Sequence, residues 1–180
     1  MKEIQASKFE DSPFGFADFD RNDALQKHEN FVRTLRNNNF ATAVGLLEEH
    51  FRGIVNSSPK QPNISLSTDE LNGENLRKPF TYLTKILGYD LTSMELDLKE
   101  LMTYYYEYRN RVVHNLGHIK IEKGKGEAEQ GKLFNFLVKF PSIDVNKEFG
   151  RVTIKGKSFT IDFCDKAESF LLKIVKGFKK

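Results

Sequence analysis

The sequence has very little cysteine and no tryptophan. Cys164 is the one thiol among 180 residues, which excludes a disulfide within the chain and a zinc site built on several cysteines. This usage is typical of a reducing compartment. Residues 1–8 lack the apolar run of a signal peptide, so we expect a cytoplasmic protein. We also expect no metal and no cofactor.

Long apolar runs and a strong net charge are absent as well. No run approaches the roughly 18 apolar residues of a membrane-crossing helix, so we expect no membrane partner. The net charge of +3 lacks the excess of a non-specific nucleic-acid binder. That total hides an asymmetry, because residues 1–117 carry a net charge of −3 and residues 118–180 one of +6. A basic C-terminal third can guide an anionic substrate.

Aromatic residues are plentiful, with 16 Phe and 6 Tyr. Each buries a large apolar area, so a chain of this length can build one substantial core. Residues 1–20 show no periodicity and predict an irregular leader, whereas residues 21–180 predict a single domain.

Apolar residues recur at helical spacing in several segments. The predicted helices cover residues 20–35, 40–54, 80–87, 94–115 and 167–178. Asn37-Asn38-Asn39 interrupts the first two and predicts a turn between antiparallel partners. Thr92, with Glu95 three residues later, has the pattern of a capping box at the start of the longest helix. Asn115-Leu116-Gly117 predicts the end of that helix.

The C-terminal third contains strand signals before the last helix. Leu133–Phe140 is a continuous apolar run stopped by Pro141, which predicts a strand. Residues 152–154 and 159–163 alternate apolar and polar side chains on either side of Gly156, which predicts a hairpin. The expected fold is therefore mainly α, an antiparallel bundle of four to five helices with a small antiparallel β insertion around 133–163.

The densest group of reactive side chains lies near the end of the longest predicted helix. Asn110 and His114 are four residues apart and share a helical face, and the long side chain of Arg109 can reach toward it. A histidine can accept or donate a proton near neutral pH. An arginine can hold a phosphate and stabilise charge that develops on it. Such a set suits metal-independent RNA cleavage, in which the 2′-hydroxyl attacks its own phosphodiester.

The segment Arg109-Asn110-Arg111-Val112-Val113-His114 resembles the R-x-x-x-x-H signature of the HEPN superfamily, including the polar residue after the Arg. The resemblance covers residues 20–117 and the last helix. It implies a small helical bundle and a metal-independent endoribonuclease of a toxin–antitoxin or antiviral defence system. It also implies a homodimer in which two motifs face each other across a composite cleft.

The resemblance also assigns roles to individual residues. Arg109 and His114 become the catalytic pair, with Asn110 supporting them. Some members of the superfamily carry a tyrosine two residues after the His that a partner modifies with AMP, but here that residue is Leu116. A cognate antitoxin or another defence-system protein is a possible partner.

Four further residues near the motif are candidates for RNA binding. Arg111 can grip a backbone phosphate, and Tyr104 or Tyr106 can stack on a base. Core packing is nevertheless the simpler role for the tyrosines, above all for Tyr105 and Tyr108. His118 and Lys120 follow the helix, and Lys120 begins a basic loop. These candidates complete the predicted site: Arg109, Asn110 and His114 for catalysis, and Arg111, Tyr106, His118 and Lys120 for RNA.

Other interpretations remain open at this stage. Arg109 and His114 can simply complement the helix dipole. The chain can also be a non-catalytic HEPN-like module that binds RNA or a nucleotide or forms dimers, or a helical interaction domain unrelated to nucleic acid. The spacing of His114 and His118 is found in helical zinc sites. Gly117 is expected to end the helix between them, however, and no third ligand is near in sequence.

Overall fold

A computed structural model describes residues 16–58, 66–73, 75–126 and 129–178. The chain divides into two compact units, Met1–Leu35 and Arg36–Lys180. Residues 1–15 of the predicted leader lie outside the described residues. Residues 16–20 of the same segment are helical and form the start of α1.

Helix α1 spans Phe16–Asn56 without a break, so the turn predicted at Asn37–Asn39 is wrong. Asn37 is only 6% exposed, and its Oδ1 accepts a hydrogen bond from the Tyr108 hydroxyl at 3.3 Å. Asn38 and Asn39 are exposed, and each costs a helix only about 0.5–0.7 kcal/mol relative to alanine. Burial of the adjacent Phe40 contributes about 2–3 kcal/mol, which outweighs that local preference.

In the first unit, residues 16–35 form the N-terminal part of α1. Lys27 Nζ pairs with Asp23 Oδ2 at 2.6 Å, one turn apart. The Thr34 hydroxyl donates a hydrogen bond to the carbonyl of Asn30 at 2.8 Å. Exposed pairs at this spacing contribute only a few tenths of a kcal/mol, so they support the helix locally.

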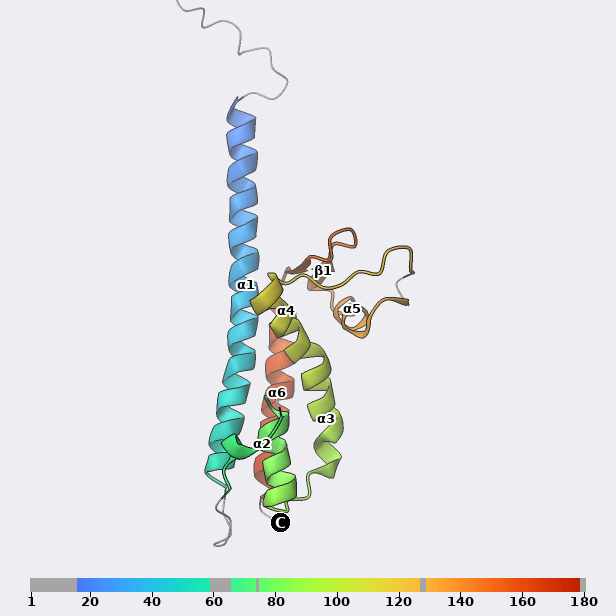
Figure 1. Cartoon of the computed structure of the whole chain (residues 1–180). Coiled ribbons are helices and arrows are strands. Elements are labelled where there is room, and N and C mark those ends of the chain that lie inside the picture. The colour runs from blue at the N-terminus through green and yellow to red at the C-terminus, as the bar shows by residue number, and fades with distance from the viewer. Residues whose placement is uncertain (1–15, 59–65, 74, 127–128, 179–180) are drawn as a thin grey trace, which may run out of the picture. The chain divides into compact units, whose positions relative to one another are not determined.

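The second unit is a bundle of helices to which α1 contributes from Arg36 onward (Figure 1). The mainly helical fold with a small antiparallel sheet is confirmed. In chain order the other described helices are η1 (Thr68–Glu70), α2 (Arg77–Thr81), the π-helix η2 (Tyr82–Ile86), η3 (Thr92–Met94), α3 (Glu95–Glu100), the π-helix η4 (Leu101–Tyr106), α4 (Glu107–Asn115), α5 (Lys132–Leu137) and α6 (Ser158–Gly177).

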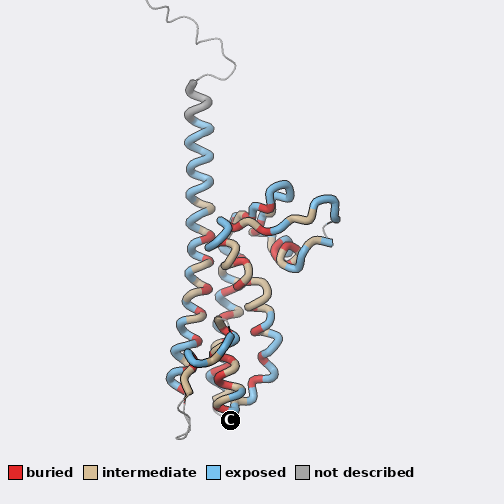
Figure 2. Tube along the Cα trace, viewed as in Figure 1, coloured by how far each residue is buried: buried red, intermediate tan, exposed pale blue. Residues whose placement is uncertain are grey.

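Aromatic rings dominate the core of this bundle, and Figure 2 shows the buried positions on the facing sides of its helices. The ring of Phe40 lies 5.4 Å from that of Tyr108, 5.0 Å from Phe159 and 5.5 Å from Phe163. Tyr105 and Tyr108 are fully buried, which confirms their predicted place in the core. The contact between Phe40 and Tyr108 fixes the helix that carries Arg109, because Tyr108 immediately precedes Arg109.

The β insertion is smaller than the sequence indicates. Strands β1 (Ile143–Val145) and β2 (Val152–Ile154) pair antiparallel, with Ile143 opposite Ile154. The strand predicted at Leu133–Phe140 is wrong, since this segment contains α5. A short apolar run fits either structure, and packing decides here because the Phe136 ring stacks on that of Tyr104 at 4.4 Å.

The hairpin predicted around Gly156 is also wrong, because β2 pairs with β1 and α6 already begins at Ser158. Phe159 and Phe163 are buried at a spacing of four residues, whereas Ile161 is 46% exposed. The alternation that suggested a strand is the first turn of a longer helical pattern. Its buried positions are Phe159, Phe163, Ala167, Phe170 and Ile174.

The longest predicted helix is present but starts differently. Thr92 lies in the 3₁₀ turn η3, and its N–H donates a hydrogen bond to Asp90 Oδ1 at 3.2 Å. The predicted capping box with Glu95 is not formed. The π-helix η4 then connects α3 to α4, and π-helical turns inside α-helices are frequent near functional sites. Among the described helices, none is both long and apolar enough to cross a membrane.

Candidate functional site

The candidate site lies on α4, whose end is built by two left-handed residues. Leu116 has φ 51° and Gly117 φ 80°, and the Gly117 N–H donates to the Arg111 carbonyl at 2.9 Å. A Cβ on Gly117 would lie 3.1 Å from Asn37 Nδ2, so a larger residue would crowd α1 as well as strain the backbone. The predicted end of the helix at Asn115–Gly117 is confirmed.

Arg109 is half-buried and held on two sides. Its Nη1 donates a hydrogen bond to Asn110 Oδ1 at 3.1 Å, and its Cζ lies 5.6 Å from the centre of the Tyr106 ring. Its Nε is buried and has no hydrogen-bond partner among the residues that the structure describes. A buried donor without a partner is costly, so this atom does not stabilise the fold.

His114 lies one turn after Asn110 and is exposed. Its ring makes no hydrogen bond or ion pair with any described residue, so both nitrogens are open to solvent or to a ligand. On an α-helix, residues five apart point about 140° away from each other, so Arg109 and His114 do not share a face directly. The hydrogen bond to Asn110 draws the guanidinium toward the face that carries His114.

The site is also supported by Glu48, a residue that no sequence pattern near the motif indicates. The Tyr106 hydroxyl donates a hydrogen bond to Glu48 Oε1 on α1 at 2.5 Å, and Tyr106 is only 5% exposed. A buried ring offers no face to a base, so the predicted RNA-stacking role of Tyr106 is not retained, and the residue instead supports Arg109. Glu48 lies 58 residues from Tyr106, and no local signal connects the two.

A second buried contact holds α4 against α1. The Tyr108 hydroxyl donates to Asn37 Oδ1, and the Nδ2 of the same asparagine lies beside Gly117. Asn37 therefore lies next to the residue that precedes the motif and next to the glycine that follows α4. This contact explains why a polar residue occupies the core side of α1, where the sequence suggested a turn.

The remaining predicted RNA-binding residues lie in different surroundings. Arg111 is paired within α4, with its Nη2 2.6 Å and its Nε 3.0 Å from Glu107 Oε1. His118 Nδ1 lies 2.9 Å from the Asn115 carbonyl oxygen, and its backbone forms a bridge with Arg151. Lys120 is exposed. None of the three forms a hydrogen bond or ion pair with Arg109 or His114 in the part of the chain that the structure describes, and their RNA roles stay predictions.

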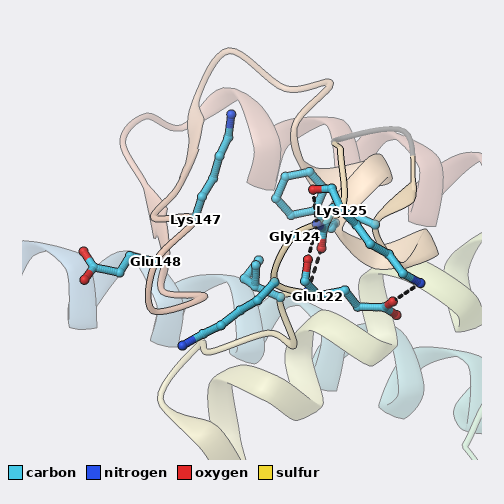
Figure 3. Close-up of a pocket in the computed structure, with 9 residues that line it drawn as sticks. Glu122, Gly124, Lys125, Lys147 and Glu148 are labelled. Atoms are coloured by element: carbon cyan, nitrogen blue, oxygen red, sulfur yellow. Dashed lines mark hydrogen bonds and ion pairs between the residues drawn. The ribbon is translucent and has the colours of Figure 1, made fainter.

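The basic loop after α4 forms a pocket of about 400 Å³ with the β1–β2 turn (Figure 3). Glu122 and Lys125 form an ion pair across the loop, and the hydrogen bond from Lys125 keeps the pKa of Glu122 below its usual range. Gln130 fixes the loop, because its Nε2 donates to the carbonyl of Glu122 and its Oε1 accepts from the Glu122 N–H, both at 2.9 Å. Lys147 and Glu148 line the opposite side in Figure 3. Carboxylates thus offset part of the positive charge of this pocket.

The arrangement on α4 supplies three chemical functions at one helix end. Arg109 can bind an oxyanion through the Nη donors that its bond to Asn110 leaves free. His114, exposed to solvent, can accept or donate a proton. Asn110 holds the Arg109 guanidinium in place through its Oδ1. Within the described residues, no group of three or more His, Cys, Asp or Glu is placed to hold a metal ion.

Comparison with known proteins gives no match for this chain. No family model matches it, and neither a curated protein nor a solved structure does.

Proposed function

We propose that this protein is a metal-independent endoribonuclease of the HEPN type. The observation that carries the proposal is the Arg109 guanidinium, whose hydrogen bond to Asn110 turns it toward the helix face of the exposed His114. The helical bundle and the position of the motif at a helix end support the same family. A cytoplasmic role in a toxin–antitoxin or antiviral system, with a cognate antitoxin, belongs to this proposal.

The proposed reaction is the attack of the ribose 2′-hydroxyl on the adjacent phosphorus. His114 takes the proton from the 2′-oxygen as the bond from that oxygen to phosphorus forms. Arg109 binds a non-bridging phosphate oxygen and stabilises the negative charge that grows in the transition state. The bond from phosphorus to the 5′-oxygen breaks, and that oxygen takes up a proton from an acid. The products are a 2′,3′-cyclic phosphate and a 5′-hydroxyl.

A homodimer supplies the second proton-transfer group. One chain offers a single Arg109–His114 pair. Removal of the proton from the 2′-hydroxyl and protonation of the 5′-oxygen are served best by two histidines, one as base and one as acid. Two motifs that face each other across a composite cleft bring a second His114 to the leaving oxygen. The active unit in this proposal is therefore two chains.

The test is cleavage of a mixed RNA pool by purified protein in EDTA. The wild type is expected to cut, and His114→Ala and Arg109→Ala are each expected to lower the rate at least a hundredfold. His50→Ala is the matched control, because His50 is an exposed histidine on α1 and its loss is expected to leave the rate unchanged. Full activity of His114→Ala, confirmed with protein free of other nucleases, would reject the proposed base.

A result without cleavage distinguishes the second candidate function. If the wild type binds RNA or a nucleotide but leaves RNA intact, the protein is a binding or dimerisation module that uses the same arginine. Arg109→Ala then weakens binding and His114→Ala does not. That outcome would contradict the ribonuclease proposal directly.

A further inference from the structure

A groove between α5 and the helical stretch α3–η4 combines unpaired lysines with half-exposed aromatic rings. Its volume is about 670 Å³. We define it as the lysine–tyrosine groove by the residues Lys99, Thr103, Tyr104, Lys132, Lys139 and Phe140, all of which line it.

The charge of this groove is strongly positive. Lys99, Lys132 and Lys139 are exposed, and none of them forms an ion pair with a residue of the described chain. Glu100 also lines the groove, but its Oε1 already pairs with Lys166 Nζ at 3.0 Å. Three lysines therefore face a cavity whose one carboxylate is neutralised, and an anionic ligand is the natural complement.

The aromatic content of the groove is equally specific. Tyr104 is half-exposed and stacks on Phe136 with ring centres 4.4 Å apart and an interplanar angle of 6°. Phe136 is 8% exposed, so Tyr104 is the accessible end of this two-ring stack. A flat ring that is already held parallel to another can accept a base as the third member. Stacking on a fixed ring loses little side-chain entropy.

The groove also leads toward the candidate site. Thr103 lines it, Glu107 follows Thr103 by about one turn, and His114 follows Glu107 by two turns. These residues lie along one side of a continuous helical stretch. At 1.5 Å per residue, the groove and His114 are about 16 Å apart along the axis. A ligand that occupies both must be an extended polymer.

We propose that the lysine–tyrosine groove binds single-stranded RNA next to the cleavage site, with Tyr104 stacking on a base and Lys99, Lys132 and Lys139 contacting the backbone phosphates. A charged groove with an aromatic platform is the arrangement that binds single strands without strong sequence preference. This inference rests on the proposed function, because it assigns the substrate path of the same site. It adds the substrate form: an unpaired strand, since a base within a duplex cannot stack on Tyr104.

The test measures binding without cleavage. A fluorescent twelve-nucleotide RNA with all 2′-hydroxyls methylated has no attacking group, so anisotropy reports affinity alone. The triple variant Lys99→Gln, Lys132→Gln and Lys139→Gln is expected to bind at least tenfold more weakly. Its plot of log affinity against log salt is expected to be shallower by about 2, at roughly 0.7 per phosphate contact.

Matched variants distinguish an affinity loss that comes from the groove from one that comes from the lower total charge. Lys85, Lys157 and Lys176 are exposed and do not line the groove, so their triple change to Gln removes the same charge elsewhere. That control is expected to stay within about twofold of the wild type. Tyr104→Phe is expected to retain affinity, whereas Tyr104→Leu is expected to lose roughly five- to hundredfold, the effect of losing one base stack.

The outcomes divide cleanly between the two proposals. Equal losses in both triple variants, or no loss in the groove variant, would overturn the groove assignment. A duplex of the same methylated sequence that binds as tightly as the single strand would also overturn it. If the groove variants lose binding while the wild type cleaves no RNA, the groove stands and the ribonuclease proposal fails. If the wild type cleaves RNA and the groove variants cleave and bind equally well, the ribonuclease proposal stands and the groove assignment fails.

Discussion

The Tyr106 hydroxyl donates a hydrogen bond to Glu48 Oε1 at 2.5 Å and so ties the residue that supports Arg109 to helix α1. The same ring lies 5.6 Å from the guanidinium carbon of Arg109. The position of the proposed phosphate-binding arginine is therefore coupled to a carboxylate that is distant in sequence. Changes at Glu48 and Tyr106 are expected to act on the site through Arg109.

Tyr106→Phe keeps the ring next to Arg109 and removes the hydrogen bond to Glu48. The free energy of unfolding is expected to fall by about 1–2 kcal/mol, because Glu48 loses a partner. Urea denaturation measures this change. RNA cleavage is expected to fall less than tenfold in Tyr106→Phe, whereas Tyr106→Ala, which also removes the ring, is expected to lower it more. Equal activity of Tyr106→Ala and the wild type would show that the ring does not position Arg109.

Asn37→Ala tests the buried contact between α1 and α4. Loss of the hydrogen bond between the Tyr108 hydroxyl and Asn37 is expected to cost about 1 kcal/mol, even though alanine is the better helix former. Asn38→Ala, one residue later and exposed, is expected to stabilise the protein by a few tenths of a kcal/mol. Opposite signs for the two neighbours in urea denaturation are the predicted result. A stabilising Asn37→Ala would mean that the hydrogen bond from Tyr108 to Asn37 contributes less than the gain in helix propensity.

Gly117→Ala tests the end of α4. The residue has φ 80°, and its new Cβ would also meet Asn37 Nδ2 at 3.1 Å. The expected loss is about 1–2 kcal/mol from backbone strain, with a further loss from the contact. Gly124→Ala is the control, because Gly124 has the same φ of 80° but nothing within 4 Å of its Cβ. A thermal unfolding midpoint that falls equally in both variants would leave no role for the contact with Asn37.

Tyr105 gives the protein a predictable response to alkaline pH. Burial and the hydrogen bond to Asp162 raise the pKa of Tyr105 far above its usual range. The unfolded chain ionises this tyrosine near pH 10, whereas the folded chain keeps it neutral. The stabilisation of the folded state by neutral Tyr105 is therefore fully present below about pH 10. It is lost as the pH rises further, because the unfolded state then releases the proton first.

Tyr105→Phe isolates this contribution. The variant is expected to be less stable than the wild type at pH 8 by about 1 kcal/mol, through loss of the bond to Asp162. The difference is expected to shrink as the pH rises above 10. Urea denaturation of both proteins at pH 8, 9, 10 and 10.5 measures it. A difference that grows with pH would contradict the raised pKa.

The sequence predicts the helices with a strong amphipathic period best. The stretch that ends at Asn115 and the last helix are both present, since their apolar spacing agrees with the core that they build. The segments that failed are those with two possible patterns. Leu133–Phe140 fits a strand or a helix equally, and only the stack of Phe136 on Tyr104 decides between them.

The candidate site divides in the same way. Arg109, Asn110 and His114 are visible in the sequence because they are close together in the chain. Glu48 and Asn37 are not, because their contacts with Tyr106 and Tyr108 span 58 and 71 residues. Those contacts depend on how α1 packs against α4, and no local pattern encodes that packing. The lysine–tyrosine groove is not visible in the sequence either, because α5 forms one of its walls and the sequence predicts a strand for that segment.

The chemistry of the RNA ends tests the proposed ribonuclease activity most sharply. A radiolabelled single-stranded RNA is incubated with the wild type and with His114→Ala in EDTA, and the new ends are analysed by acid treatment and phosphatase. We expect a 2′,3′-cyclic phosphate and a 5′-hydroxyl from the wild type, and at least a hundredfold less of both from His114→Ala. Ends with a 5′-phosphate, or equal products from the two proteins, would contradict the ribonuclease proposal.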